Sequence, residues 1–203
     1  MSRDRLIVGG LFAAGLAVLG YTAFGPFVTP VMAQEDGPGP NLVIDVAGVA
    51  NGQIVIDLAS DTAPAHVEQI TALAREGAYD NVVFHRVIDG FMAQTGDVQF
   101  GKAGGDLSMA GMGGSSRPDL PAEFTTSASF DRGAVGMARA ADPNSANSQF
   151  FIMFAPAPHL DGQYTIVGRV IAGMEVVDAI KRGEGRNGEV SEPDVMTKVT
   201  VQD

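Results

Sequence analysis

The chain contains no cysteine among its 203 residues. This absence excludes disulfide bonds, thiolate catalysis and zinc sites built from cysteine. It leaves the redox compartment open, because a protein without thiols tolerates either an oxidising or a reducing environment. Basic residues are also scarce: 13 Lys and Arg stand against 24 Asp and Glu, and the formal net charge is -11. We therefore expect no binding of nucleic acid.

Sequence patterns typical of metal-binding or phosphate-binding sites are missing as well. The three histidines (His66, His85 and His159) lie on separate segments without ligand-like spacing, so we expect no metal site and no cofactor. Glycine pairs at 104–105 and 113–114 lack the Lys-Ser/Thr ending of a phosphate-binding loop. They are interpreted as part of a long flexible loop. On a strand, neighbouring residues point to opposite faces, so His85 should face away from the residue that follows it and have a structural role.

The first 33 residues have the pattern of a targeting segment. Two arginines precede an uncharged run over 6–28, and small residues follow it. Roughly 20 apolar residues can span a bilayer, so residues 1–33 are predicted to be either a cleaved signal peptide or an N-terminal membrane anchor. The Gly25-Pro26 break favours cleavage, before Gln34. Both alternatives place the folded domain in the periplasm or outside the cell, the second with a membrane tether through 6–28.

Residues 34–40 form a short acidic linker rich in Gly and Pro, and residues 41–203 have the length of one domain. A helix is predicted over 63–76, with Thr62 as its cap and Gly77 at its end, and a second over 174–181. Alternating and apolar runs predict eight strands. They cover residues 42–46, 53–58, 82–87, 92–96, 133–138, 149–154, 164–170 and 195–201.

The connections between these elements indicate the fold class. Asn51-Gly52 separates the first two strands and predicts a hairpin with a two-residue turn. Residues 100–116 are rich in Gly and Met and are expected to form a long loop. Eight short strands and two helices predict a mainly β fold, a closed eight-stranded antiparallel barrel capped by two α-helices.

Two motifs combine one cation, two amides and an apolar patch. Residues 84–97 read FHRVIDGFMAQTGD and residues 147–152 read NSQFFI. Such side chains suit an uncharged, ring-like group, and they include no obvious means of breaking covalent bonds. The residues that supply these groups are Arg86, Phe91, Met92, Gln94, Gln149, Phe150 and Phe151. Phe150 is expected in the core, because its neighbour Phe151 takes the position that faces the site.

With GMARA at 136–140 and LDGQYTIVGRV at 160–170, these motifs resemble the cyclophilins in order and spacing. The likeness extends over roughly residues 41–201, nearly the whole domain. Cyclophilins are peptidyl-prolyl cis-trans isomerases with an eight-stranded barrel and two capping helices. The resemblance implies a bacterial, exported enzyme that accelerates rotation about X–Pro bonds. It also implies proline-containing peptides and folding exported proteins as partners, no cofactor, and a monomer.

The resemblance implies that Arg86 and Gln94 are catalytic. The guanidinium would stabilise the twisted X–Pro bond more than either planar form, and the amide would hold the guanidinium in place. Arginine does not deprotonate at ordinary pH, so activity should vary little across neutrality. The residues expected to bind the substrate are Phe91, Met92, Ala138, Arg139, Ala140, Gln149, Phe151, His159, Leu160 and Tyr164.

Three positions depart from the family's common pattern. His159 stands where many eukaryotic members have tryptophan, which predicts weak binding of cyclosporin. Tyr164 replaces a frequent pocket histidine and can still stack and donate a hydrogen bond. Arg139 replaces a common asparagine, and its charge is expected to favour acidic residues near the proline.

The alternative function is a proline-peptide binding or chaperone module, in which turnover is incidental. The presence of both Arg86 and Gln94 favours the enzyme, since binding alone needs only the apolar pocket. A barrel for small apolar ligands, like a lipocalin, is not supported by the order of the motifs, and small barrels of this kind usually fill their interior with side chains.

Overall fold

The computed structural model describes residues 35–203, so the predictions for residues 1–33 lie outside the described part. Its strands form one antiparallel sheet in the order β3-β9-β1-β2-β8-β6-β7-β5-β4. Among the described residues, no helix is both long and apolar enough to cross a membrane. The strands are β1 (Asn41–Ala47), β2 (Gly52–Leu58), β3 (Val82–Val83), β4 (Arg86–Ile88), β5 (Met92–Thr95), β6 (Ala134–Met137), β7 (Phe150–Met153), β8 (Ile166–Ala172) and β9 (Val195–Gln202), and the helices are α1 (Pro64–Arg75), η1 (Pro158–Leu160) and α2 (Met174–Ala179).

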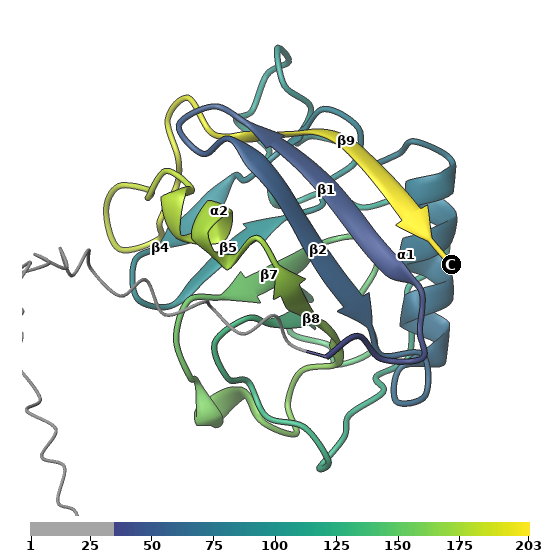
Figure 1. The fold of residues 1–203 in the computed structure, drawn as a ribbon. Coiled ribbons are helices and arrows are strands. Elements are labelled where there is room, and N and C mark those ends of the chain that lie inside the picture. The colour runs from purple at the N-terminus through teal and green to yellow at the C-terminus, as the bar shows by residue number, and fades with distance from the viewer. Residues whose placement is uncertain (1–34) are drawn as a thin grey trace, which may run out of the picture. The chain divides into compact units, whose positions relative to one another are not determined.

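The prediction of a closed eight-stranded barrel was wrong. The predicted strand over 82–87 is interrupted at Phe84 and His85, which gives nine strands. As the chain advances through 82–87, its backbone partners fall steadily from Met196 to Gly188. The chain therefore continues in one direction from β3 to β4, and these two edge strands cannot pair with each other. The result is a curled half-barrel of nine strands (Figure 1).

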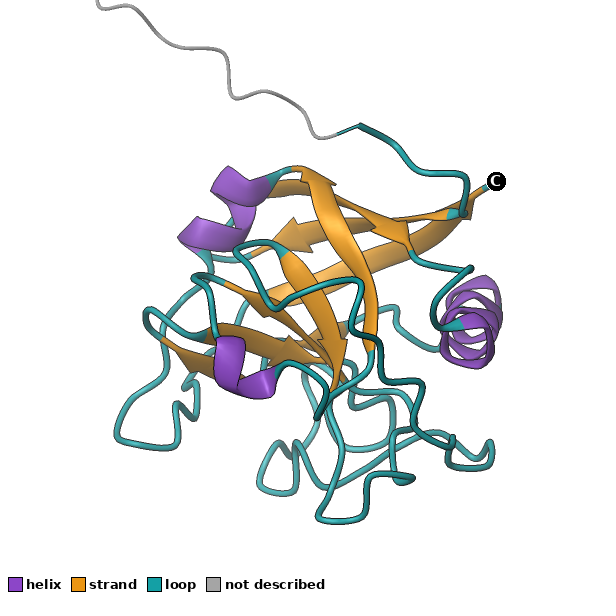
Figure 2. Ribbon diagram, turned by 90° about the horizontal axis from the view of Figure 1, so that it is seen from below, coloured by secondary structure: helices purple, strands orange, loops and turns teal. Residues whose placement is uncertain are grey.

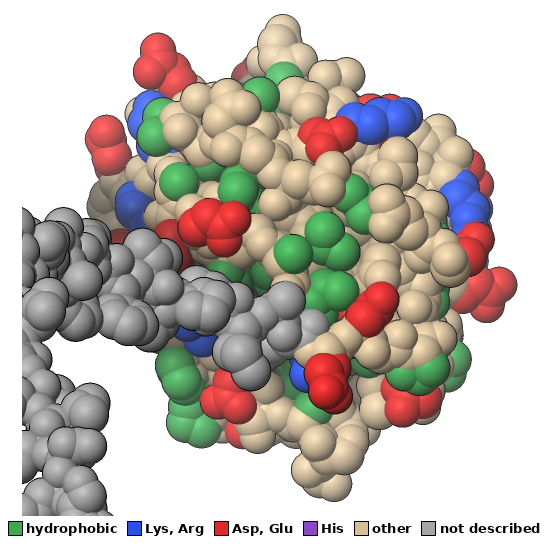
Figure 3. Space-filling model, in the orientation of Figure 1, with side chains coloured by type: hydrophobic (Ala, Val, Ile, Leu, Met, Phe, Trp, Pro, Cys, Tyr) green, Lys and Arg blue, Asp and Glu red, His purple; other side chains and the backbone are tan. Residues whose placement is uncertain are grey.

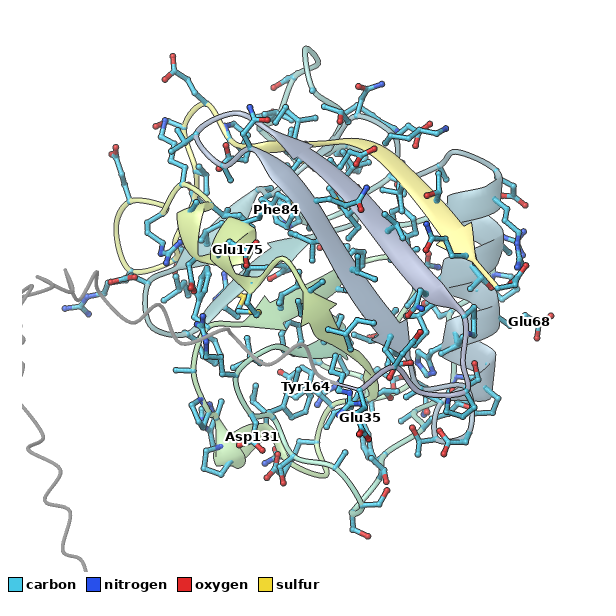
Figure 4. The ribbon with its side chains drawn as sticks, viewed as in Figure 1. Glu35, Glu68, Phe84, Asp131, Tyr164 and Glu175 are labelled. Carbon is cyan, nitrogen blue, oxygen red and sulfur yellow. The ribbon has the colours of Figure 1, made fainter. Side chains whose placement is uncertain are left out.

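The interior of the curled sheet holds the main core. Inward-facing residues of β1 and β2 alternate with outward-facing ones, and Ile44, Ile54 and Ile56 are completely buried. Phe84 lies behind β1 and β2 in the view of Figure 4 and belongs to the same core. Phe150 is also part of it, as predicted. A second, smaller cluster is formed by Met92, Phe130, Ala134, Phe151, Met153, Ala157, Leu160 and Ile166.

The two predicted helices are present, on opposite sides of the strands, while long loops gather at one end (Figure 2). Helix α1 ends as predicted: Gly77 has a φ of 71°, and the N–H of Ala78 donates to Leu73 O at 2.9 Å. The predicted hairpin between β1 and β2 also forms. Its turn is longer than two residues, because β1 ends at Ala47 and β2 begins at Gly52, which leaves residues 48–51 between them.

The start of α1 differs from the prediction. Thr62 donates to Ala59 O instead of capping the helix. Glu123, from a distant loop, accepts hydrogen bonds from the N–H groups of Ala65 and His66 at 3.2 and 3.1 Å. It also contacts Nδ1 of His66 at 2.6 Å. The loop carboxylate thus satisfies the free N–H groups that a local cap would take.

Replacing Glu123 with glutamine is expected to lower the free energy of unfolding by about 1 kcal/mol at neutral pH. Burial alone would raise the pKa of Glu123, but hydrogen bonds from His66 and the backbone outweigh it and hold the pKa below its ordinary value. A lowered folded-state pKa gives stability that is present above the unfolded-state pKa and lost as the pH falls. The difference between parent and variant should therefore shrink when urea unfolding is measured near pH 4 instead of pH 7.

Glu68→Gln provides the matched control, because Glu68 is exposed and projects outward from α1 (Figure 4). It should change stability little at either pH. A Glu123→Gln deficit that stays constant from neutral to acid pH would show that the carboxylate's charge does not contribute to the cap.

Candidate active site

Three adjacent strands align the central side chains of the site. Arg86 on β4 pairs with Gln94 on β5, and Gln94 pairs with Phe151 on β7. Nη1 of Arg86 donates to Oε1 of Gln94 at 3.0 Å, and Nε2 of Gln94 donates to Oε1 of Gln149 at 2.9 Å. Nε of Arg86 donates to the backbone oxygen of Asn187 at 2.9 Å. The guanidinium is thus held from two sides, as the predicted role of Gln94 requires.

Within residues 35–203, no carboxylate neutralises the charge of Arg86. Burial lowers the pKa of its guanidinium, but an arginine side chain does not lose its proton at ordinary pH, so the group stays cationic. Among residues 35–203, the ion pairs involve other basic groups and leave Arg86 out. Acidic side chains are scattered over the surface seen in Figure 3. The site is therefore a locally positive spot on an acidic protein.

A pocket of about 190 Å³ opens beside the guanidinium. Phe151 forms its floor: its ring stacks on Phe130 with centroids 5.7 Å apart and meets the Tyr164 ring edge-on at 5.9 Å. Every residue that lines the pocket is one that the sequence predicts for the site. These residues are Arg86, Phe91, Met92, Gln94, Ala138, Arg139, Phe151, Leu160 and Tyr164.

The remaining predicted residues lie next to this pocket. Ala140 and Gln149 line a neighbouring cavity of about 540 Å³, and Ala138 and Arg139 border both spaces. His159 does not line the first pocket. Its ring stacks on Phe91, with centroids 6.0 Å apart and an interplanar angle of 24°. The two cavities thus form adjoining parts of one groove, and His159 supports the groove wall.

Arg139 is engaged within the protein. Its guanidinium carbon lies 4.4 Å from the centroid of the Tyr164 ring, on the segment that leads into β8 (Figure 4). Nη2 donates to Gln163 O and Nη1 to Ala140 O, each at 2.9 Å. Arg139 therefore braces the pocket wall through Tyr164. The expected preference for acidic residues near the proline stays a prediction, since these contacts occupy much of the guanidinium.

Several groups of the site escaped the sequence-based prediction. The carbonyl oxygens of Gly111 and Gly113 accept hydrogen bonds from Gln149, and that of Asn187 accepts one from Arg86. A backbone oxygen can accept a hydrogen bond whatever side chain its residue carries, so no sequence motif indicates these contacts. The predicted flexible loop over 100–116 is also tightly packed here: a Cβ at Gly113 would lie 2.5 Å from Oδ1 of Asp97.

His85 faces away from Arg86, as predicted. It is 8% exposed, and its ring packs against Gly111. In the described part of the chain, no group of three or more His, Cys, Asp or Glu side chains is arranged to hold a metal ion. The pocket itself combines the guanidinium groups of Arg86 and Arg139 with aromatic and aliphatic walls. This arrangement can bind an apolar ring and place a positive charge beside it.

Comparison with known proteins agrees with this geometry. Residues 43–201 match the family described as cyclophilin type peptidyl-prolyl cis-trans isomerase/CLD. A probable peptidyl-prolyl cis-trans isomerase of Brucella suis is 57% identical over 155 residues, which cover 75% of this chain and 79% of that protein.

Solved structures show the same fold. A cyclophilin type isomerase of Cryptosporidium parvum, crystallised in the presence of the dipeptide Ala-Pro, has a TM-score of 0.69 and 26% identity, with 80% of this chain and 99% of that chain covered. A cyclophilin from Hirschia baltica has a TM-score of 0.67 and 26% identity, with 81% and 74% covered. Sequence, fold and site agree: the chain belongs to the cyclophilin-type peptidyl-prolyl cis-trans isomerases.

Proposed function

We propose that this isomerase assists the folding of exported proteins by rotating X–Pro bonds in the groove beside Arg86. The observation that carries the proposal is a guanidinium that forms no ion pair with a carboxylate of residues 35–203 and lies beside a pocket of about 190 Å³ with aromatic and aliphatic walls. A pocket of this kind suits a proline side chain, which is apolar and lacks an N–H donor. The guanidinium then lies beside the bond that must rotate.

Rotation is slow without help because amide resonance imposes a barrier of about 18–20 kcal/mol. Twisting the bond removes that resonance and leaves the prolyl nitrogen and the displaced carbonyl as better hydrogen-bond acceptors. Arg86 donates to these groups and so binds the twisted state more tightly than either planar state. Gln94 fixes the guanidinium, and Phe91, Met92, Phe151 and Leu160 hold the ring.

The rest of the groove would take the peptide chain. The cavity bordered by Ala138, Arg139, Ala140 and Gln149 adjoins the proline pocket and offers backbone groups and an amide. The Ala-Pro dipeptide used with the Cryptosporidium parvum relative supports a short X–Pro segment as the recognised unit. No covalent intermediate and no cofactor enters this mechanism.

A folding role is tested with an exported protein whose refolding has a slow phase limited by proline isomerisation. Such phases last about 10–100 s at 25 °C. Catalytic amounts of the full-length isomerase should shorten this phase and leave faster phases unchanged. A slow phase that is unaffected, although the same preparation accelerates exchange in a short X–Pro peptide, would contradict the folding role. Binding of the peptide without any acceleration would instead favour the binding-module alternative.

Export is supported by the pattern of residues 1–33, in which basic residues precede an apolar run and small residues. Cleavage is expected before Gln34. The check is to fractionate producing cells and determine the protein's N-terminus by mass spectrometry. A periplasmic species that begins at Gln34 indicates a cleaved signal peptide, and an intact membrane-bound species indicates an anchor. An intact protein in the cytosol would contradict both.

A further inference from the structure

Asp97 is a completely buried carboxylate at the end of β5. Its Oδ1 accepts hydrogen bonds from the N–H groups of Gln99 and Phe100 at 3.0 and 2.8 Å. Its Oδ2 accepts from those of Gly111 and Gly113 at 2.7 and 2.9 Å. Burying a charged carboxylate is costly unless hydrogen bonds compensate, and these four donors do so. The carboxylate therefore fastens residues 107–113, the Gly-Met loop, to the end of a strand of the active site.

The same two glycines also bind Gln149, the first of two amide side chains that connect the loop to Arg86 through hydrogen bonds. Nε2 of Gln149 donates to the carbonyl oxygens of Gly111 and Gly113 at 3.0 and 2.7 Å. Oε1 of Gln149 accepts from Gln94, whose own Oε1 accepts from Arg86. In this series of hydrogen bonds, the donor is always the group nearer to the guanidinium, and the acceptor is the group nearer to the loop. Asp97 closes the series at the other end through the two glycine N–H groups.

Polar contacts rather than apolar burial keep the Gly-Met loop in place. Its two methionines, Met109 and Met112, are 44% and 74% exposed. At Gly111 the φ is 95°, and an added Cβ would lie 3.1 Å from the His85 ring. An added Cβ at Gly113 would lie 2.5 Å from Oδ1 of Asp97. The loop backbone thus rests directly on Asp97 and His85, and its carbonyl positions depend on that seating.

We propose that Asp97 is a positioning residue for the isomerisation. By fixing Gly111 and Gly113, it sets the amide of Gln149, which sets Gln94 and through it the guanidinium of Arg86. Asp97 touches neither the proline pocket nor the substrate, because it is absent from the linings of both cavities of the groove. This inference rests on the proposed role of Arg86 in catalysis.

The test is Asp97→Asn in the full-length protein. Asparagine replaces one carboxylate oxygen with an NH₂ group, which cannot accept hydrogen bonds. One pair of backbone N–H groups therefore loses its acceptor. We expect kcat for an X–Pro peptide to fall about tenfold while KM changes less than about twofold, since the ring pocket is intact. Asp106→Asn is the matched control. Asp106 lies just before the loop, and its carboxylate accepts a hydrogen bond from the N–H of Ser108 within it. The side chain is exposed and absent from the linings of both cavities of the groove, so kcat should stay unchanged.

A double-mutant cycle separates positioning from a general loss of stability. In a Gln149→Leu background the route from Asp97 to Arg86 is already broken, so Asp97→Asn should change kcat less than about twofold. A second tenfold loss there, or an unchanged kcat in the folded single variant, overturns the proposal. If Asp97→Asn does not fold, Gly113→Ala lifts the loop from the carboxylate and should give the same loss of kcat. If Arg86→Ala itself retains full activity, that result contradicts the proposed catalytic role of Arg86 rather than the hydrogen-bonded route from Asp97 to Arg86.

Discussion

Arg86→Ala is expected to reduce kcat/KM for an X–Pro peptide by about 100-fold or more, the usual cost of removing a group that stabilises a transition state. The reason is that Arg86 is a cation at the rim of the proline pocket, and in the described part of the chain no carboxylate pairs with it. The loss should fall on kcat, because the apolar walls that bind the ring remain. The measurement is cis-to-trans exchange of a short peptide, followed alongside peptide binding.

Binding can be followed by tyrosine emission, since the chain has no tryptophan and Tyr164 lines the pocket. Arg182→Ala is a control of equal charge change: Arg182 pairs with Asp89 and stacks on Phe154, outside the groove lining. Arg86→Lys keeps the charge but loses the planar fork that donates to Gln94 and Asn187 together, so it should remain impaired. Equal losses in the Arg86 and Arg182 variants would show that net charge, not position, matters.

Phe151→Ala is expected to weaken peptide binding about tenfold, or about 1.4 kcal/mol, and to lower the free energy of unfolding by about 3–5 kcal/mol. Both effects have one cause: the ring is 5% exposed and forms the pocket floor against Phe130 and Tyr164. Its loss leaves a hollow beneath the bound proline. Urea unfolding and peptide titration at low temperature measure the two effects separately.

Phe150→Ala is the control, because Phe150 is adjacent on β7 but packs in the main core, edge-on to Tyr79. It should lose similar stability and keep its peptide affinity in the folded fraction. If the two variants lose affinity equally, the pocket floor is not specific to Phe151, and general loosening of the sheet explains the loss.

The motifs predicted which residues come together around one pocket better than they predicted the sheet. Alternation on β7 was enough to separate Phe150, in the core, from Phe151, in the pocket. The number of strands was not accessible, because apolar residues continue through Phe84, although Phe84 and His85 belong to neither β3 nor β4. A local rule likewise assigned the cap of α1 to Thr62, although Glu123 from a distant loop provides it. Such long-range contacts depend on the completed fold and leave no trace in neighbouring residues.

The place of β9 has a consequence for how the site is assembled. Among the described strands, β9 comes last in sequence but lies between β1, which comes first, and β3. Until β9 has joined the sheet, β1 and β3 have no strand partner on that side. The segment that carries Arg86 follows β3 after only two residues, and along one side it pairs with residues 188–194, which lead into β9. The seating of Arg86 therefore depends on contacts of large sequence separation, and such contacts form slowly during folding.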